Sequence, residues 1–120
     1  MLRVNKLPEI LRGVLQDGAE GCVLMTSEGS TLASEFISSD ISETVLSAIC
    51  SSMWSNYSRV TSGEILQLQI IKFEHGTLGI SRAGEKYIIS IYGKDIKIGM
   101  LRVKLEALNS YFSRVFDQLK

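Results

Sequence analysis

Side chains that could carry catalysis or bind a metal are scarce in this 120-residue sequence, which contains one histidine and two cysteines. His75 lies between Glu74 and Gly76, a setting typical of an exposed turn. A general base or a nucleophile needs a partner group within hydrogen-bonding reach, and the residues around His75 supply none. One histidine and two distant cysteines also lack the spacing of a zinc site. We therefore expect no catalytic residue and no bound metal.

The two cysteines, Cys22 and Cys50, both lie in apolar segments. In such segments a thiol usually behaves as a small buried hydrophobic side chain. Two widely spaced cysteines do not make a disulfide framework, and free thiols are typical of a reducing compartment. We therefore expect two inert thiols in the core of a cytosolic protein.

The ten glycines do not form a phosphate-binding loop. Neither G-x-x-x-x-G-K-[ST] nor G-x-G-x-x-G occurs in the sequence. The segment 79–83 reads G-I-S-R-A, and its final alanine stands where the nucleophile elbow of a hydrolase needs glycine. The carboxylates are scattered singly along the chain. We therefore expect no nucleotide or other cofactor, and no enzymatic activity.

The composition indicates one folded domain that covers residues 1–120. Hydrophobic residues make up 45% of the chain, which is enough for an ordinary core. Thirteen basic residues balance thirteen acidic residues, so no surplus of charge favours nucleic acid or an anionic membrane. No apolar run reaches the ~18 residues of a membrane span, and the first residues resemble neither a signal peptide nor a myristoylation site. We therefore expect any membrane location to come from a partner.

Hydrophobic spacing predicts eight elements that would position these side chains. Three amphipathic stretches predict helices, which run from Leu7 to a stop at Gly18, from a cap at Asp40 or Ser42 to about Tyr57, and over 101–119. Five alternating or apolar runs predict strands, which cover 21–26, 30–34, 64–73, 77–83 and 86–93. The first two strands should meet in a hairpin turn with Gly29 at positive φ, and 22–25 should be covered on both faces. The short turns favour an α+β fold, α-β-β-α-β-β-β-α, with a five-stranded antiparallel sheet and three flanking helices.

The second predicted helix is apolar around about half of its circumference, whereas a helix that lies on a sheet needs a narrower stripe. The excess favours a second contact, most simply with a partner helix. The alternative is a helix enclosed between its own sheet and a loop. The side chains predicted to face the sheet are Leu46, Cys50 and Trp54. The side chains predicted to face a partner are Val45, Ile49, Ser52, Met53 and Asn56.

The strand predicted at 64–73 is long and apolar, and such a strand would promote aggregation if it were left open at a sheet edge. Pairing with a second subunit would join two sheets and bring the two second helices side by side. We therefore expect a protein interface that includes backbone hydrogen bonds from about residue 65 to residue 71. The strand residues predicted at this interface are Ile65, Gln67, Gln69 and Ile71.

Several segments resemble the roadblock/dynein light chain family, and within it the roadblock subunits of Ragulator-type complexes. They include M-L-R at 1–3, L-M-T-S-E-G-S at 24–30, and A-I, M-W and Y at 48–49, 53–54 and 57. They also include G-M-L-R-V-K at 99–104, followed by A-L at 107–108 and Tyr111. The resemblance extends over the whole chain and agrees with the predicted order of elements.

The resemblance implies a non-catalytic scaffold or adaptor subunit that pairs with a second roadblock protein. It favours a heterodimer, although the residues themselves leave a homodimer open. It further implies a lipid-anchored scaffold subunit that holds the pair on the cytosolic face of the late endosome, lysosome or vacuole. There the pair would dock Rag-type GTPases for amino-acid signalling to the TOR kinase.

Two other functions remain open within the same resemblance. One is a regulator of a small GTPase, acting as an activating or exchange module, as some microbial roadblock proteins do. No arginine in the sequence stands out as an arginine finger for that role. The other is a self-pairing light chain of a dynein-type motor complex.

Overall fold

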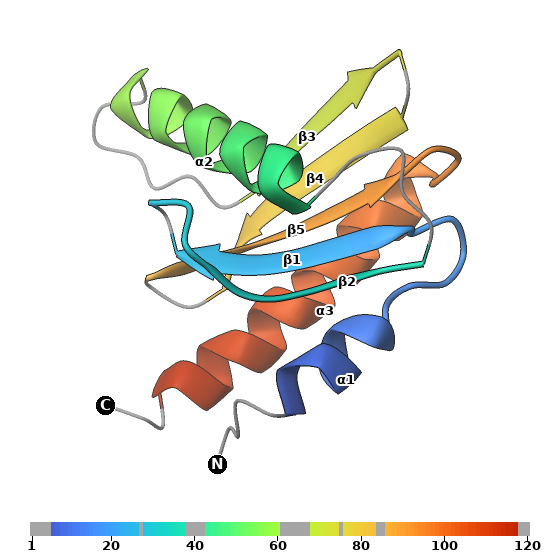
Figure 1. Cartoon of the computed structure of the whole chain (residues 1–120), viewed down its shortest axis with the longest axis horizontal. Coiled ribbons are helices and arrows are strands. Elements are labelled where there is room, and N and C mark those ends of the chain that lie inside the picture. Colours follow the sequence, from blue (N-terminus) through green and yellow to red (C-terminus); the bar gives the residue numbers. More distant parts are fainter. Residues whose placement is uncertain are drawn as a thin grey trace.

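A computed structural model describes residues 6–26, 28–37, 43–60, 68–74, 76–83 and 86–117. The elements follow the predicted order of helices and strands (Figure 1). They are α1 (Leu7–Arg12), β1 (Gly21–Thr26), β2 (Thr31–Phe36), α2 (Glu43–Val60), β3 (Leu68–Phe73), β4 (Gly76–Arg82), β5 (Tyr87–Gly93) and α3 (Ile98–Asp117).

The five strands form one antiparallel sheet in the order β2-β1-β5-β4-β3. Helix α2 lies on one face of this sheet, and α1 and α3 lie on the other (Figure 1). The predicted fold class is therefore confirmed. Strands β2 and β3 form the two edges of the sheet. Strand β3, which is predicted to pair with a second subunit, therefore lies at an edge.

Strand β1 is an interior strand of the sheet, and its side chains enter two hydrophobic cores. Cys22 and Leu24 belong to the core under α1 and α3, whereas Val23 and Met25 belong to the core under α2. All four side chains are fully buried. The continuous apolar run at 22–25 thus reflects a strand covered on both faces, as predicted.

The first helix is shorter than predicted. It ends at Arg12, where the Gly13 amide donates to main-chain carbonyls of the last turn, and the predicted stop at Gly18 is wrong. Gly18, at φ +98°, instead forms the turn that leads into β1. The apolar spacing continues past the helix because Leu15, in the segment between α1 and β1, also packs into the core. Spacing alone therefore could not mark the end of the helix.

The other boundaries differ by a few residues. Helix α3 begins at Ile98, three residues before the predicted start. The prediction missed these residues because the first turn of the helix is exposed and is not part of the apolar stripe. Strand β2 begins at Thr31 and ends at Phe36, two residues beyond the prediction. Gly29 takes the predicted positive φ, at +101°. The predicted helix caps, the predicted strand residues 64–67 and His75 lie outside the described residues.

Candidate pairing surface

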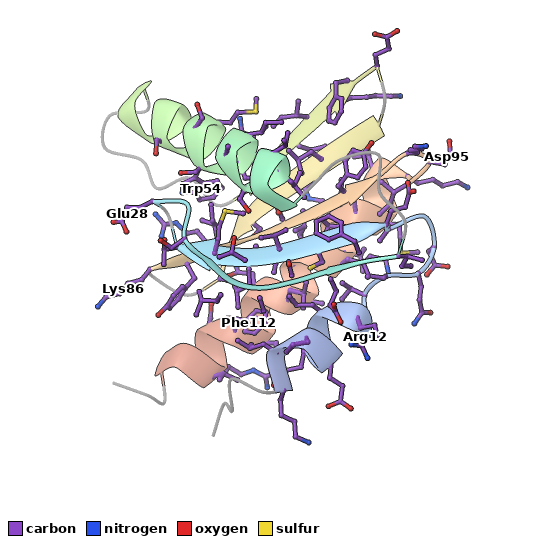
Figure 2. The ribbon with its side chains drawn as sticks, in the orientation of Figure 1. Arg12, Glu28, Trp54, Lys86, Asp95 and Phe112 are labelled. Atoms are coloured by element: carbon purple, nitrogen blue, oxygen red, sulfur yellow. The ribbon has the colours of Figure 1, made fainter. Side chains whose placement is uncertain are left out.

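Three buried side chains hold α2 on the sheet, and half-buried Met53 packs against the same core. Leu46, Cys50 and Trp54 are buried in the core that they share with β1, β4 and β5. Trp54 points from α2 towards the sheet (Figure 2). These are the three residues predicted to face the sheet, and that part of the prediction is confirmed.

One flank of α2 faces the β1–β2 hairpin and consists of serines. The Ser47 and Thr31 hydroxyls lie 3.1 Å apart and share a hydrogen bond. A Cβ added to Gly29 would lie 3.3 Å from the Ser51 Oγ, so the hairpin closely approaches the helix. A shallow groove of about 530 Å³ lies beside this contact. Its lining includes Glu28, which lies at the hairpin (Figure 2), and no second titratable group among the residues that the structure describes.

The opposite flank of α2 is apolar and faces the β4–β3 side of the sheet, since the serine flank faces the hairpin. Val45 and Ile49 are 49% and 37% exposed. Met53 is half-buried and Ser52 is exposed, while the side chain of Asn56 lies outside the described residues. The structure therefore brings Val45, Ile49 and Met53 to this flank, whereas Ser52 lines the groove on the hairpin side. Whether a partner covers that flank stays a prediction.

Strand β3 presents alternate side chains to the two faces of the sheet. Leu68 and Ile70 pack against the core under α1 and α3, and Ile71 packs against the core under α2. By the two-residue period of a strand, Gln69 lies on the α2 side together with Ile71. These two predicted interface residues therefore share a face with the apolar flank of α2. The other two, Ile65 and Gln67, lie outside the described residues.

Phe73 belongs to the same surface, although the sequence analysis did not include it. It lies two residues beyond Ile71 on β3 and is 37% exposed. Its ring stacks on Tyr92 of β5, with the ring centroids 5.9 Å apart and the planes at 24°. The two-residue period that linked Gln69 to Ile71 would have identified Phe73 if it had been extended to the end of the strand.

The opposite edge of the sheet is protected. Helix α1 packs along β2, and the Arg12 guanidinium donates to one carboxylate oxygen of Glu35 from Nε at 2.9 Å and from Nη2 at 2.5 Å. Figure 2 shows Arg12 on α1, next to this edge. A charged side chain on an edge strand, such as Glu35 on β2, discourages pairing with another strand. The two edges therefore differ: β2 carries Glu35 and its ion pair, whereas β3 lies beside the apolar flank of α2.

The two thiols are free and buried, as predicted. Burial raises the pKa of the Cys50 thiol to about 11, although the Ser90 hydroxyl that faces it offsets part of the rise. Burial also raises the pKa of Cys22, and the positive charge of Lys104 opposes this rise. Both thiols are therefore protonated at neutral pH and are poor nucleophiles.

Within the described ranges, histidine, cysteine, aspartate and glutamate side chains form no group of three that could hold a metal ion. The helices in those ranges are also too short or too polar to cross a membrane.

No family model matches the chain. Its fold is similar to that of MglB from Myxococcus xanthus, with a TM-score of 0.83 and 13% identity over 100% of this chain and 96% of that chain. It is also similar to an MglB with tetrameric arrangement, with a TM-score of 0.75 and 15% identity over 96% of this chain and 90% of that chain. A third similar structure is a Roadblock/LC7 domain from Streptomyces avermitilis, with a TM-score of 0.77 and 16% identity over 91% and 96% of the two chains. The chain therefore has the fold of roadblock/LC7 domain proteins, as its sequence resemblance predicted.

Proposed function

We propose that this chain is a single-domain, roadblock-type adaptor subunit without catalytic activity, which pairs with a second roadblock-fold protein through α2 and β3. The observation that carries the proposal is the apolar flank of α2, which faces the part of the sheet where β3 forms an edge. Pairing there would extend the sheet across β3 and bring the two copies of α2 side by side.

The residue types on this surface suit a helix–helix and strand–strand contact. Ile49 and Met53 supply apolar area, and the small side chain of Ser52 permits close approach of a second helix. The main-chain groups of β3 that point away from β4 offer hydrogen bonds to a partner strand. We propose the predicted interface residues with Phe73 added, namely Val45, Ile49, Ser52, Met53, Asn56, Ile65, Gln67, Gln69, Ile71 and Phe73.

The fold comparison supports assembly between roadblock-fold chains. One similar structure is an MglB in a tetrameric arrangement, so a chain with this fold can associate with other copies. The resemblance in the sequence favours a heterodimer for this protein. We therefore take a different roadblock-fold chain as the first partner to test, and a second copy as the alternative.

The proposed role of the pair is that of a Ragulator-like scaffold. The resemblance at residues 24–30, 48–57 and 99–111 supports docking of Rag-type GTPases for amino-acid signalling to TOR. A lipid-anchored subunit would hold the pair on the cytosolic face of the late endosome, lysosome or vacuole. The balanced charge of the chain is consistent with a membrane location that a partner provides.

A second candidate function is regulation of nucleotide hydrolysis or exchange on a small GTPase. The fold match to MglB from Myxococcus xanthus over the whole of this chain favours this second function, because the sequence resemblance includes microbial roadblock proteins with such a role. GTP hydrolysis by a Rag-type GTPase, measured with and without the purified chain, discriminates the two functions. An adaptor leaves the hydrolysis rate unchanged, whereas an activating module raises it.

The proposal is tested by affinity purification of the tagged chain from its native cell, followed by identification of the bound proteins. We expect the wild-type chain to recover a roadblock-fold protein and a small GTPase. Ile49→Asp should recover neither, because a charge at the centre of the seam blocks pairing. Recovery of no roadblock-fold protein by the wild-type chain would overturn the proposal.

A further inference from the structure

The side chain of Gln69 is polar, whereas the two residues that follow it on the same face of β3, Ile71 and Phe73, are apolar. Its amide oxygen is buried and has no hydrogen-bond partner in the described part of the chain. The only other described side-chain oxygen in this state belongs to Ser90, whose hydroxyl faces the Cys50 thiol. Gln69 is therefore one of two described residues with a buried side-chain oxygen that has no hydrogen-bond partner.

The register of the sheet places Gln69 beside the proposed interface. Gln69 of β3 lies opposite Ile80 of β4, which in turn lies opposite Ser90 of β5. Cys50 of α2 faces Ser90, so Gln69 lies two strands away from the point where Cys50 meets the sheet. The apolar flank of α2 faces this side, and Gln69 therefore lies in the corner between that flank and the open edge.

An apolar side chain would suit this corner better in an isolated subunit. Gln69 is followed by Ile70 and Ile71, and a buried acceptor without a donor loses its water and gains nothing in return. Polar groups at such positions can be retained because they select one pairing geometry, as single buried amides do in coiled coils. The free energy lost by leaving this acceptor unpaired in the isolated chain is then recovered when a partner supplies a donor.

We propose that Gln69 is a specificity-determining residue of the pairing surface, where its amide oxygen accepts a hydrogen bond from an N–H donor on the edge strand of a second roadblock-fold chain. This inference rests on the proposed function. The flexible side chain of glutamine can turn its amide from the corner to the adjacent edge. A one-residue slip of a strand moves every side chain to the other face, so this hydrogen bond forms in one register and not in its neighbour.

The test compares Gln69→Leu with the wild-type chain in two measurements. The first is the thermal midpoint of the isolated chain, which should rise because the unpaired acceptor is gone. The second is the dissociation constant with the roadblock-fold partner identified by affinity purification, or with a second copy if the chain pairs with itself. This constant should increase by roughly 3- to 10-fold, since one hydrogen bond is lost.

Stability should rise while affinity falls, and this opposition distinguishes a specificity role from a structural one. A purely structural glutamine would change the midpoint and the affinity in the same direction, and that result would overturn the inference. Gln16→Leu is the matched control. Gln16 is exposed and its amide donates to the carbonyl of Gly13 at the end of α1, and α1 lies on the opposite face of the sheet from α2 (Figure 1). This variant should leave the dissociation constant unchanged.

The inference and the proposed function fail in different ways. If the wild-type chain pairs with no roadblock-fold chain, both fail together. If the wild-type chain pairs, Ile49→Asp prevents pairing, and Gln69→Leu pairs as tightly as wild type, then the inference on Gln69 fails alone.

Discussion

Cys22 and Cys50 lie in the two cores on opposite faces of the sheet, and burial keeps both thiols protonated. The sequence predicted this state correctly, because each cysteine lies within an apolar run. What the sequence could not provide was the neighbour of each thiol. The Ser90 hydroxyl faces Cys50, and the charge of Lys104 acts on Cys22. These contacts depend on how the helices lie on the sheet.

The raised pKa of Cys50 predicts a loss of stability at alkaline pH. The thiol has an ordinary pKa of 9.0 and a folded-state pKa of about 11, so the unfolded chain loses this proton first as the pH rises. The contribution of the protonated thiol is therefore complete below pH 9 and is lost progressively towards pH 11. The full effect is about 3 kcal/mol, at 1.36 kcal/mol for each pKa unit.

Urea unfolding of the wild-type chain and of Cys50→Ala, from about pH 8 to about pH 10.5, tests this prediction. The free energy of unfolding should fall more steeply with pH in the wild-type chain than in the variant. The comparison cancels the titration of lysines and tyrosines, which both proteins share. Equal slopes would mean that Cys50 titrates at its ordinary pKa in the folded state.

Two glycines form a matched pair for a second prediction. A Cβ on Gly93 would collide with the carbonyl oxygen of Gly18, a main-chain atom that cannot move aside alone. Gly99, in the first turn of α3, has no atom within 4 Å of its added Cβ. We expect Gly93→Ala to lower the free energy of unfolding by about 1–3 kcal/mol, as overpacking does. Gly99→Ala should raise it by up to about 1 kcal/mol, because alanine favours helix.

Chemical unfolding of the two variants beside the wild-type chain measures both changes. The glycine contacts were not accessible to sequence analysis, since Gly93 and Gly18 are far apart in the chain and meet only when β5 lies next to the turn before β1. A Gly93→Ala variant as stable as the wild type would mean that the turn at Gly18 moves without cost.

At the scale of elements, hydrophobic spacing predicted the type and order of all eight elements. The spacing misplaced element boundaries where a buried side chain lies beyond the end of a helix, or where the first turn of a helix is exposed. Leu15 continues the apolar spacing of α1 from outside the helix, and the first turn of α3 shows no stripe because it is exposed. Spacing records which side chains are buried and not where the helical hydrogen bonds stop. The end of α1 at Arg12 therefore required the structure.

Helix α2 shows how far the same reasoning extends to the candidate site. Its wide apolar arc predicted two separate contacts, and the structure divides the arc into a buried side and an exposed flank. The serine flank that contacts the hairpin was not predicted, because serines carry no hydrophobic signal. The sequence therefore predicted that α2 has an apolar flank. Which edge of the sheet this flank faces could be assigned only from the contact between Thr31 of the hairpin and Ser47 of α2.

Ile49→Asp is the element-scale test of the exposed flank. Because Ile49 is only partly buried in the isolated chain, the variant should fold with nearly unchanged stability. Pairing should weaken by at least about 100-fold, since an unpaired buried charge costs about 3 kcal/mol or more. Sedimentation or light scattering with the identified partner measures the change.

The control for Ile49→Asp is Glu106→Lys on α3, which lies on the opposite face of the sheet from α2 (Figure 1). Glu106 forms an exposed ion pair with Arg102, at 3.1 Å, and such pairs contribute little. Pairing should therefore survive this change. A complex that keeps its affinity with Ile49→Asp, or loses it with Glu106→Lys, would place the interface elsewhere.

At the scale of the molecule, the two sheet edges carry different protection. Helix α1 and the ion pair between Arg12 and Glu35 protect β2, whereas β3 borders the exposed flank of α2. The antiparallel sheet and its flanking helices were predictable from alternation and turns. The identity of the edges was partly predictable: the sequence suggested that β3 needs a partner, but only the strand order revealed that β2 is the other edge and is protected.

The contrast between the edges predicts where hydrogen exchange will change on pairing. In the isolated chain, the amides of β3 that point away from β4 exchange with solvent, because they lie at an open edge. A partner strand supplies their acceptors, so exchange in β3 should slow when the complex forms. The amides of α2 are already bonded within the helix and should slow only modestly, as pairing suppresses local opening. Strand β2 and helix α3 should keep their rates, since both lie away from the seam.

Exchange measured by mass spectrometry on the free chain and on the complex tests this pattern directly. Slowed exchange along β2 with none along β3 would move the interface to the protected edge.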